Sequence, residues 1–454
     1  MAGINVREVV LDILLELSKG EEYSNVLIAA ALDKYDYLDD KEKAFIKRVC
    51  EGTIERRIQI DFVLDQYSKT HVMKMKPLIR ELLRMSVYQL LFMEHIPPAA
   101  VCNEAVKLAK KRRFQQLQGY VNGVLRNIDR GKKHITYPDR DKDLAAWLSV
   151  RYSMPSWLVS HFSAVYGQEA CEKILRAFLE REAVCVRLDE GLTDKERMAL
   201  LEAWKLEGVE VEDHPYLSYA VRLRKAAGVR RLAGYEDGRF AVQDASSMLV
   251  VEAAGISPGD TVIDVCAAPG GKALHAAQKL QGTGQVIACD VSRYKTAKIE
   301  ENRARLGLQN VNVRVQDART REEAFVGQAD ILLADVPCSG LGVIGHKQDI
   351  KYRVTPQSLT EIVELQREII ANVIDYIKPG GILMYSTCTM NPGENGELVG
   401  WLCETFGFEP VSMAERLPEQ LKKDAERGML QLLPGVHETD GFFFAKLRKK
   451  GNPE

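Results

Sequence analysis

Two cysteines and an aspartate stand where the chain could carry out covalent chemistry. The apolar run that begins at Ala329 ends in Asp335, and Pro337 and Cys338 then open a glycine-rich turn. A second apolar run, GGILMYST, ends beside Cys388. Short apolar runs bounded by turn residues are typical of buried strands, so we expect both thiols at strand ends of one sheet.

A pair of thiols beside a methyl donor suggests one kind of reaction. Carbon 5 of a pyrimidine is not nucleophilic, but a thiolate that adds to carbon 6 makes an enamine, which can attack a methyl sulfonium. Asp335 could hold the ring nitrogen and stabilise charge during this addition. A second thiol could then assist release of the first. The residues alone leave open which cysteine, Cys338 or Cys388, would attack.

The other cysteines carry no such signal. The chain has nine cysteines, an odd number, and no Cys-x-x-Cys pair, which argues against a disulfide framework and against a zinc site. We therefore expect no metal, and a reducing cytoplasm is the simplest location. Six of them stand in apolar patterns and are interpreted as small hydrophobic residues: Cys50, Cys102, Cys171, Cys185, Cys289 and Cys403.

The segment DVCAAPGGK places a loop of small residues between a strand and a helix. Its glycines let a ligand approach the backbone, and the helix that follows offers free amides. The spacing matches neither the dinucleotide fingerprint nor a P-loop, and a glycine pair alone would favour a turn without a ligand. We predict cofactor contacts from the whole loop: Cys266, Ala267, Ala268, Pro269, Gly270, Gly271 and Lys272.

Three acids, Asp290, Asp317 and Asp335, follow the next strand-like runs. In doubly wound sheets, ligands bind outside the carboxyl ends of the strands. A carboxylate at Asp290 could accept hydrogen bonds from ribose hydroxyls, and one at Asp317 could meet an adenine amino group. A single aspartate in such a place is more often a cap or turn residue. Three acids beside a glycine-rich loop favour a nucleoside cofactor without pyrophosphate, and S-adenosylmethionine fits best.

The 454 residues are too many for one ordinary domain. Helical periodicity predicts an all-α domain over 1–132, and a polar linker follows it. Residues 143–233 mix short strands and helices and predict a small α/β module, similar to an RNA-recognition fold. Strands and helices alternate over 234–450, which predicts a Rossmann-like α/β domain with a parallel sheet. No run is long enough to span a membrane, and the charged N-terminal helix pattern is not that of a signal peptide.

The motifs DVCAAPGGK, ADVPCSGLG, YSTCTMNPGEN and LPGVHETDGFFFAKL together resemble those of the Sun/Fmu family of RNA cytosine-5 methyltransferases. The resemblance implies that Cys388 is the nucleophile and that Cys338 assists release. It also implies that the loop Cys266 to Lys272, with Asp290, Asp317 and Asp335, contacts S-adenosylmethionine. One position departs from the pattern, because many relatives carry arginine where this chain has Lys295.

The helical first third resembles a NusB-like RNA-binding domain. Its fusion to such a catalytic domain is similar to the branch of the family that methylates cytosine 967 of 16S rRNA. The resemblance therefore implies methylation of carbon 5 of a cytosine in 16S rRNA. A self-contained multidomain chain favours a monomer, and we expect it to bind neither membrane nor DNA. Two alternatives stay open: the same chemistry on tRNA or another rRNA site, and a catalytically inactive RNA-binding assembly factor.

Overall fold

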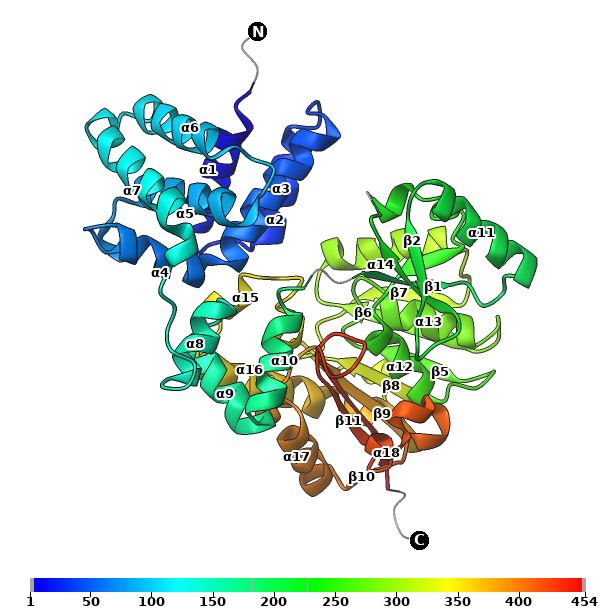
Figure 1. The fold of residues 1–454 in the computed structure, drawn as a ribbon. Helices are drawn as coiled ribbons and strands as arrows, with labels where there is room; N and C mark the ends of the chain where they lie inside the picture. The colour runs from blue at the N-terminus through cyan, green and yellow to red at the C-terminus, as the bar shows by residue number, and fades with distance from the viewer. Residues whose placement is uncertain (1–3, 181–182, 227, 451–454) are drawn as a thin grey trace. The chain divides into compact units, whose positions relative to one another are not determined.

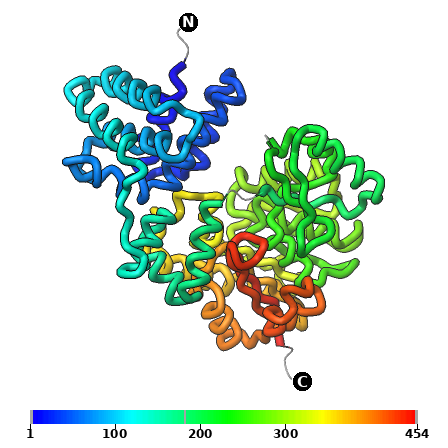
Figure 2. The backbone as a smooth tube through the Cα atoms, viewed as in Figure 1, coloured from blue at the N-terminus to red at the C-terminus, as the bar shows by residue number. Residues whose placement is uncertain are grey.

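The computed structural model describes residues 4–180, 183–226 and 228–450. The chain forms two compact units, and each is described by itself (Figure 2). The first runs up to Leu179 and includes the later segment Ile344–Arg353, and the second holds the rest. These units do not correspond one for one to the three predicted domains, whose boundaries stay predictions.

The first unit is made of helices around one apolar core. Its central helix is α5, which starts at Pro77, a residue favoured at the first helical position, and buries most of its residues. A capping box between Asp39 and Glu42 begins α3, since each side chain accepts a hydrogen bond from the other's backbone amide. The helices are α1 (Val6–Leu17), α2 (Ser24–Lys34), α3 (Asp40–Glu55), α4 (Arg57–Tyr67), α5 (Pro77–Phe92), α6 (Pro98–Lys111), α7 (Gln118–Gly131), α8 (Leu144–Arg151), α9 (Ser156–Tyr166) and α10 (Gln168–Ala177).

The segment Ile344–Arg353, which ends in the short helix α15 (Ile350–Arg353), belongs to this helical unit although it follows the Pro-Cys motif in sequence. The backbone amide and hydroxyl of Ser24 both donate to the buried carboxylate of Asp349, at 2.9 Å each. Lys351 is also buried and donates to the carbonyl of Glu55 at 2.8 Å. Buried polar groups are costly without partners, so these bonds fix the segment in the unit.

The second unit begins with a small antiparallel sheet of order β2-β3-β1-β4. Helix α11 (Asp194–Leu206) covers it and buries Trp204 completely, because the capping box at Thr193 and Glu196 starts the helix in that register. This module confirms the small α/β element expected from the sequence. Its strands are β1 (Val184–Leu188), β2 (Glu210–Asp213), β3 (Ala220–Arg224) and β4 (Phe240–Val242).

The larger sheet has the order β10-β12-β9-β8-β5-β6-β7, and β11 pairs with β12. The strands from β9 to β7 along this order are parallel, whereas β10, β11 and β12 add antiparallel pairs at the other side. They are β5 (Thr261–Asp264), β6 (Gln285–Asp290), β7 (Val311–Val315), β8 (Ala329–Asp335), β9 (Ile377–Thr387), β10 (Phe408–Pro410), β11 (Met429–Leu432) and β12 (Phe442–Lys449).

Helices cover both faces of this sheet, as the alternating pattern predicts (Figure 1). One apolar core joins the sheet to α12, α13 and α14, and a second joins it to α16 and α17. The strand order reverses at β5, so the loops after β5 and β8 lie at the switch point where such folds bind ligands. The helices are α12 (Ala245–Ala254), α13 (Gly271–Lys279), α14 (Arg293–Arg305), α16 (Pro356–Val373), α17 (Gly396–Phe406) and α18 (Lys422–Ala425).

Within the described ranges, no helix is both long enough and apolar enough to cross a membrane.

Candidate active site

The two predicted thiols lie together. Strands β8 and β9 are parallel neighbours, and Asp335 pairs with Ser386 in their register. Both chains then turn at the same edge of the sheet, which brings the sulfur atoms of Cys338 and Cys388 to 3.1 Å from each other. Neither forms a disulfide. The expectation that one sheet presents both thiols side by side is therefore confirmed.

The surroundings of Cys338 shift the pKa of its thiol. The hydrogen bond with Cys388 and then burial raise the pKa of the Cys338 thiol well above its usual range. The negative charges of Glu394 and Asp335 act in the same direction. The thiolate form of Cys338 is therefore disfavoured, and which of the two sulfurs attacks the base stays a prediction.

A buried carboxylate that the sequence analysis missed holds the Cys338 loop in place. Glu394 is fully buried, and its carboxylate accepts hydrogen bonds from the amide of Ser339 at 2.9 Å and from the hydroxyl of Ser339 at 2.6 Å. The side chain of Gln366 donates to Glu394 at 3.0 Å and to the carbonyl of Pro337 at 2.9 Å. The signal in the sequence was an isolated acid in the polar turn NPGEN directly after the second thiol.

Two glycines join the thiol loops through their backbones. The amide of Gly342 donates to the carbonyl of Cys388 at 3.0 Å, and the amide of Gly441 donates to the carbonyl of Gly342 at 3.0 Å. A Cβ atom on Gly342 would lie 1.8 Å from the carbonyl oxygen of Gly441. Only glycine allows this approach, so the positions of the two loops depend on each other.

Asp335 connects the thiols to the cofactor loop. Its carboxylate accepts from the hydroxyl of Ser386 at 2.8 Å and forms an ion pair with Lys272 at 2.7 Å. Lys272 is buried, and its ammonium also lies 4.9 Å from the centre of the Phe442 ring. We predicted a cofactor contact for Lys272; in the structure its charge is paired with Asp335, and contact with the cofactor stays a prediction.

The cofactor loop has the backbone conformation expected of a ligand-binding loop. Gly270 adopts a φ of 107°, and a Cβ there would lie 2.9 Å from the side chain of Leu274. Asp290 is buried and accepts hydrogen bonds from the amides of Ala268 and Val291, at 3.0 and 2.8 Å. Lys295 also pairs with this carboxylate at 3.2 Å, so of about four acceptor sites one is left for a ribose hydroxyl. The residues present fit S-adenosylmethionine, and its contacts with Asp290 and with the loop Cys266 to Lys272 stay predictions.

Asp264 at the end of β5 was not among the predicted residues, although it opens the motif. It is buried and accepts from the amide of Cys266 at 3.3 Å. Burial, and then the charge of Asp335, raise the pKa of Asp264 to about 7. Burial likewise raises the pKa of Cys266 well above its usual range, so that its sulfur is a neutral thiol.

Asp317 is placed differently from the other acids. It lies in the loop after β7 and forms an ion pair with Arg319 at 2.7 Å. Its side chain is about one-third exposed, at 32%. The hydrogen bond from Arg319 lowers the pKa of Asp317 below its usual value. The neighbouring amide of Gln316 donates to the carbonyl of Asp290 at 3.0 Å, so this loop reaches the end of β6. Its predicted contact with adenine stays a prediction.

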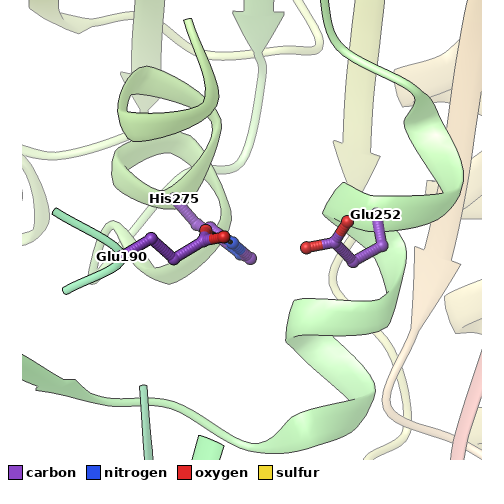
Figure 3. A group of neighbouring side chains, drawn as sticks. All are labelled: Glu190, Glu252 and His275. Carbon is purple, nitrogen blue, oxygen red and sulfur yellow. Dashed lines mark ion pairs between the residues drawn. The ribbon is translucent and has the colours of Figure 1, made fainter. Parts of the chain in front are cut away.

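Another group of acids and a histidine lies in the second unit (Figure 3). The candidate ligand atoms of Glu190, Glu252 and His275 lie within 4.8 Å of one another. The ammonium of Lys279, however, lies 2.7 Å from both carboxylates. Burial, followed by the charges of Arg187 and Lys279, lowers the pKa of His275 well below its usual value. The lysine thus supplies the positive charge that these acids require, and we interpret the group as an ion-pair cluster.

Comparison with known proteins identifies the family. A probable ribosomal RNA small subunit methyltransferase B from Bacillus subtilis (strain 168) is 37% identical and covers 99% of this chain and 100% of the relative. Ribosomal RNA small subunit methyltransferase B from Escherichia coli (strain SMS-3-5 / SECEC) is 32% identical over 96% of each chain. The chain belongs to the ribosomal RNA small subunit methyltransferase B family. The members of this family depend on S-adenosylmethionine.

Family descriptions also match the parts of the chain in the predicted order. Residues 4–130 match the NusB family, and residues 154–230 match the ferredoxin-like domain of RsmF/B-like methyltransferases. Residues 253–448 match 16S rRNA methyltransferase RsmB/F. A crystal structure titled PH0851 is similar in fold, with a TM-score of 0.80 at 24% identity over 98% of this chain and 99% of that one. The predicted fold class is thus confirmed: a NusB-like helical domain, a small α/β module and a Rossmann-like methyltransferase domain.

Proposed function

We propose that this methyltransferase modifies carbon 5 of a cytosine in 16S rRNA, by resemblance cytosine 967. The observation that carries the proposal is the approach of Cys338 and Cys388 to 3.1 Å at the ends of adjacent strands, beside Asp335. Bound S-adenosylmethionine supplies the methyl group as a sulfonium. Attack by a base carbon requires prior addition of a nucleophile to carbon 6, and a thiol pair suits both the addition and its reversal.

In this proposal Cys388 forms the bond to carbon 6. We place the attacking thiolate on Cys388, because the hydrogen bond between the sulfurs, burial and the charges of Glu394 and Asp335 raise the pKa of Cys338 and disfavour a thiolate there. The ring nitrogen takes up a proton from solvent as sulfur adds to carbon 6, and the carboxylate of Asp335 accepts the hydrogen bond of the resulting N–H group. After methyl transfer, solvent water takes the proton from carbon 5 as the bond between carbon 6 and the Cys388 sulfur breaks and Cys388 leaves as a thiolate. We assign assistance in that release to Cys338, whose thiol can donate a hydrogen bond to the departing sulfur.

RNA as the substrate is supported by the names of the full-length relatives and by the NusB family match. A base in folded RNA must leave its stack to meet the two sulfurs. We further propose that the protein acts as a monomer in the cytoplasm and that DNA is not a substrate. An inactive assembly factor is disfavoured, because the thiol pair, Asp335 and Asp290 are all present and the two sulfur atoms lie in contact.

The test is to map 5-methylcytosine in 16S rRNA and tRNA from cells with and without the protein. Loss of one methylcytosine in 16S rRNA, restored by the purified protein with S-adenosylmethionine, supports the proposal. Loss in tRNA only would assign the same chemistry to another substrate. Unchanged methylation in both RNAs, with no transfer in vitro, would contradict the proposed function.

A further inference from the structure

A cavity of about 290 Å³ lies behind the cofactor loop, within the second unit. Its lining comes from the small sheet, from the loop at Pro269 to Gly271 and from helices α13 and α14. Three arginines line it, Arg187, Arg230 and Arg305, and no acidic side chain of the described residues does. The cavity shares Pro269, Gly270 and Gly271 with the predicted cofactor loop, but none of the acids Asp290, Asp317 and Asp335 is among its lining residues.

Arg187 carries a buried charge without an acidic partner. Its side chain is almost fully buried, at 2% exposure. Its guanidinium donates to the amide oxygen of Gln243 at 2.8 Å and to that of Gln278. Burial lowers the pKa of Arg187 to about 10 despite the more distant charges of Glu190 and Asp189. Among the described residues, no carboxylate lies within ion-pair distance of it, and a buried guanidinium in this state is stabilised by an anion.

The guanidinium of Arg305 likewise has too few partners for its charge and its hydrogen-bond donors. One nitrogen of its guanidinium donates to the carbonyls of Tyr235 and Phe240, at 2.7 and 2.9 Å. Its Nε is buried and has no hydrogen-bond partner within the described part of the chain. Burial lowers the pKa of Arg305, and the positive charge of Arg230 acts in the same direction. Tyr235, Glu236 and Glu301 raise it in part. A buried donor without an acceptor costs free energy that an incoming acceptor would recover.

We propose that this cavity binds a backbone phosphate of the RNA substrate. Phosphate is the ligand that guanidinium groups recognise best, because their donors match its oxygens in pairs. Arg230 is exposed and also lines the cavity, so it can meet a strand from solvent. The half-exposed Val242 and the ring of Tyr235 offer apolar surface for the adjoining sugar or base. Since Pro269 to Gly271 separate the cavity from the cofactor acids, a phosphate held here would fix the strand relative to the methyl donor.

This inference rests on the proposed function only in taking RNA as the substrate. Its test is the salt dependence of binding of a fluorescent 16S rRNA fragment, between about 50 and 200 mM salt. The variant is Arg230→Gln, and the matched control is Arg231→Gln, because the adjacent Arg231 is also exposed but does not line the cavity. Neither change removes a buried group, so both variants are expected to fold.

Arg230→Gln is expected to weaken binding by roughly 5- to 15-fold at low salt and to reduce the salt slope by about 0.7 to 1, the value of one phosphate contact. Arg231→Gln is expected to keep the wild-type slope. Arg230→Lys should restore the slope but only part of the affinity, since lysine keeps the charge and loses the paired donors. Equal slopes for Arg230→Gln and the wild type, or equal losses in both glutamine variants, would overturn the inference.

Inorganic phosphate separates RNA from a small anion as the occupant. Phosphate should compete with the RNA fragment for the wild type and not for Arg230→Gln. A different outcome is that phosphate raises the melting temperature of the wild type but not of Arg230→Gln, while the salt slope of RNA binding is the same for both. In that case the cavity binds a free anion and the inference is wrong. Methylation is scored separately by base mapping: a changed slope with no cytosine methylation would refute the proposed function and leave the phosphate site standing.

Discussion

The two halves of the active site differ in how the protein prepares them. Around the thiols, the side chain of Glu394, the backbone of Gly342 and the ion pair of Asp335 with Lys272 are all fixed by short hydrogen bonds. At the predicted adenine end, Asp317 is partly exposed, and its carboxylate forms an ion pair with Arg319. The fold therefore holds the two thiols in position for the reaction. Asp317, by contrast, must release or share Arg319 before it can meet a ligand. Substitutions in the two halves should differ in size and in the kinetic constant that they change.

The largest effect is expected from Cys388→Ala. Without the attacking sulfur, carbon 5 stays unreactive, so turnover should fall by roughly 10³-fold or more, and no covalent complex with RNA should form. Methyl transfer from a radiolabelled donor to 16S rRNA, together with denaturing gels of the protein with RNA, measures both. Turnover within tenfold of the wild type would show that another group attacks.

Cys338→Ala should stop the reaction at a later step. The bond to carbon 6 still forms, but its release is slowed, so a protein–RNA complex that survives denaturation should accumulate while multiple turnover falls by roughly 10²-fold or more. The same gels measure it, with Cys403→Ala as a control, since Cys403 lies on α17 away from the thiol pair. A covalent complex in Cys388→Ala and none in Cys338→Ala would reverse the assignment of roles.

Glu394→Gln tests whether the fixed geometry matters for the chemistry. The amide has the same shape, but its NH₂ group faces donors from Ser339 and Gln366, so about 1–3 kcal/mol of stability and roughly 10- to 100-fold in kcat should be lost. The KM for RNA should change little. Thermal melts beside kinetics separate the two losses, and a drop in stability alone would show that Glu394 supports the fold and not the thiol loop.

Asp317→Asn is expected to have a smaller effect, on the other half of the site. The KM for S-adenosylmethionine should rise a few-fold and kcat should stay near the wild-type value, because an exposed hydrogen bond to the ligand contributes about 1 kcal/mol. Steady-state kinetics with varied donor measures this split. A kcat loss as large as that of Glu394→Gln would remove the distinction between the two halves.

Asp264 gives the smallest effect, visible in the pH dependence of stability. Its pKa rises from 3.8 to about 7 on folding, so between these values the folded state binds more protons than the unfolded state. This carboxyl therefore lowers stability as pH rises through that window. Asp264→Asn should flatten the decline in denaturant-melt stability between about pH 4 and 7. A decline as steep as that of the wild type would show that another group is responsible.

The sequence predicted the parts of the site that depend on local pattern. Apolar runs that end in Asp290, Asp335 and the two cysteines place those residues at strand ends, because parallel strands share one edge for their carboxyl ends. The roles of the two thiols came from family resemblance, since spacing does not distinguish them. The partners of each residue were not predictable, because they depend on how separate loops fold back on the sheet.

Glu394 shows this limit most clearly. Its place in a polar turn reads as a surface acid, yet it is fully buried because the turn folds against Gln366 of α16 and the Cys338 loop. The segment Ile344–Arg353 was expected to lie in the catalytic domain, and its apolar and polar pattern gave no sign that Asp349 would pair with Ser24 of the helical unit. The arginine cavity likewise combines three distant stretches of sequence.

The most direct test of the thiol chemistry is to isolate the complex of Cys338→Ala with 16S rRNA, digest both polymers and locate the attached nucleotide by mass spectrometry. We expect one methylated cytidine on the peptide that contains Cys388 and on none of the peptides with the other cysteines. Attachment at a different residue, or a complex without any covalently bound cytidine, would contradict the account.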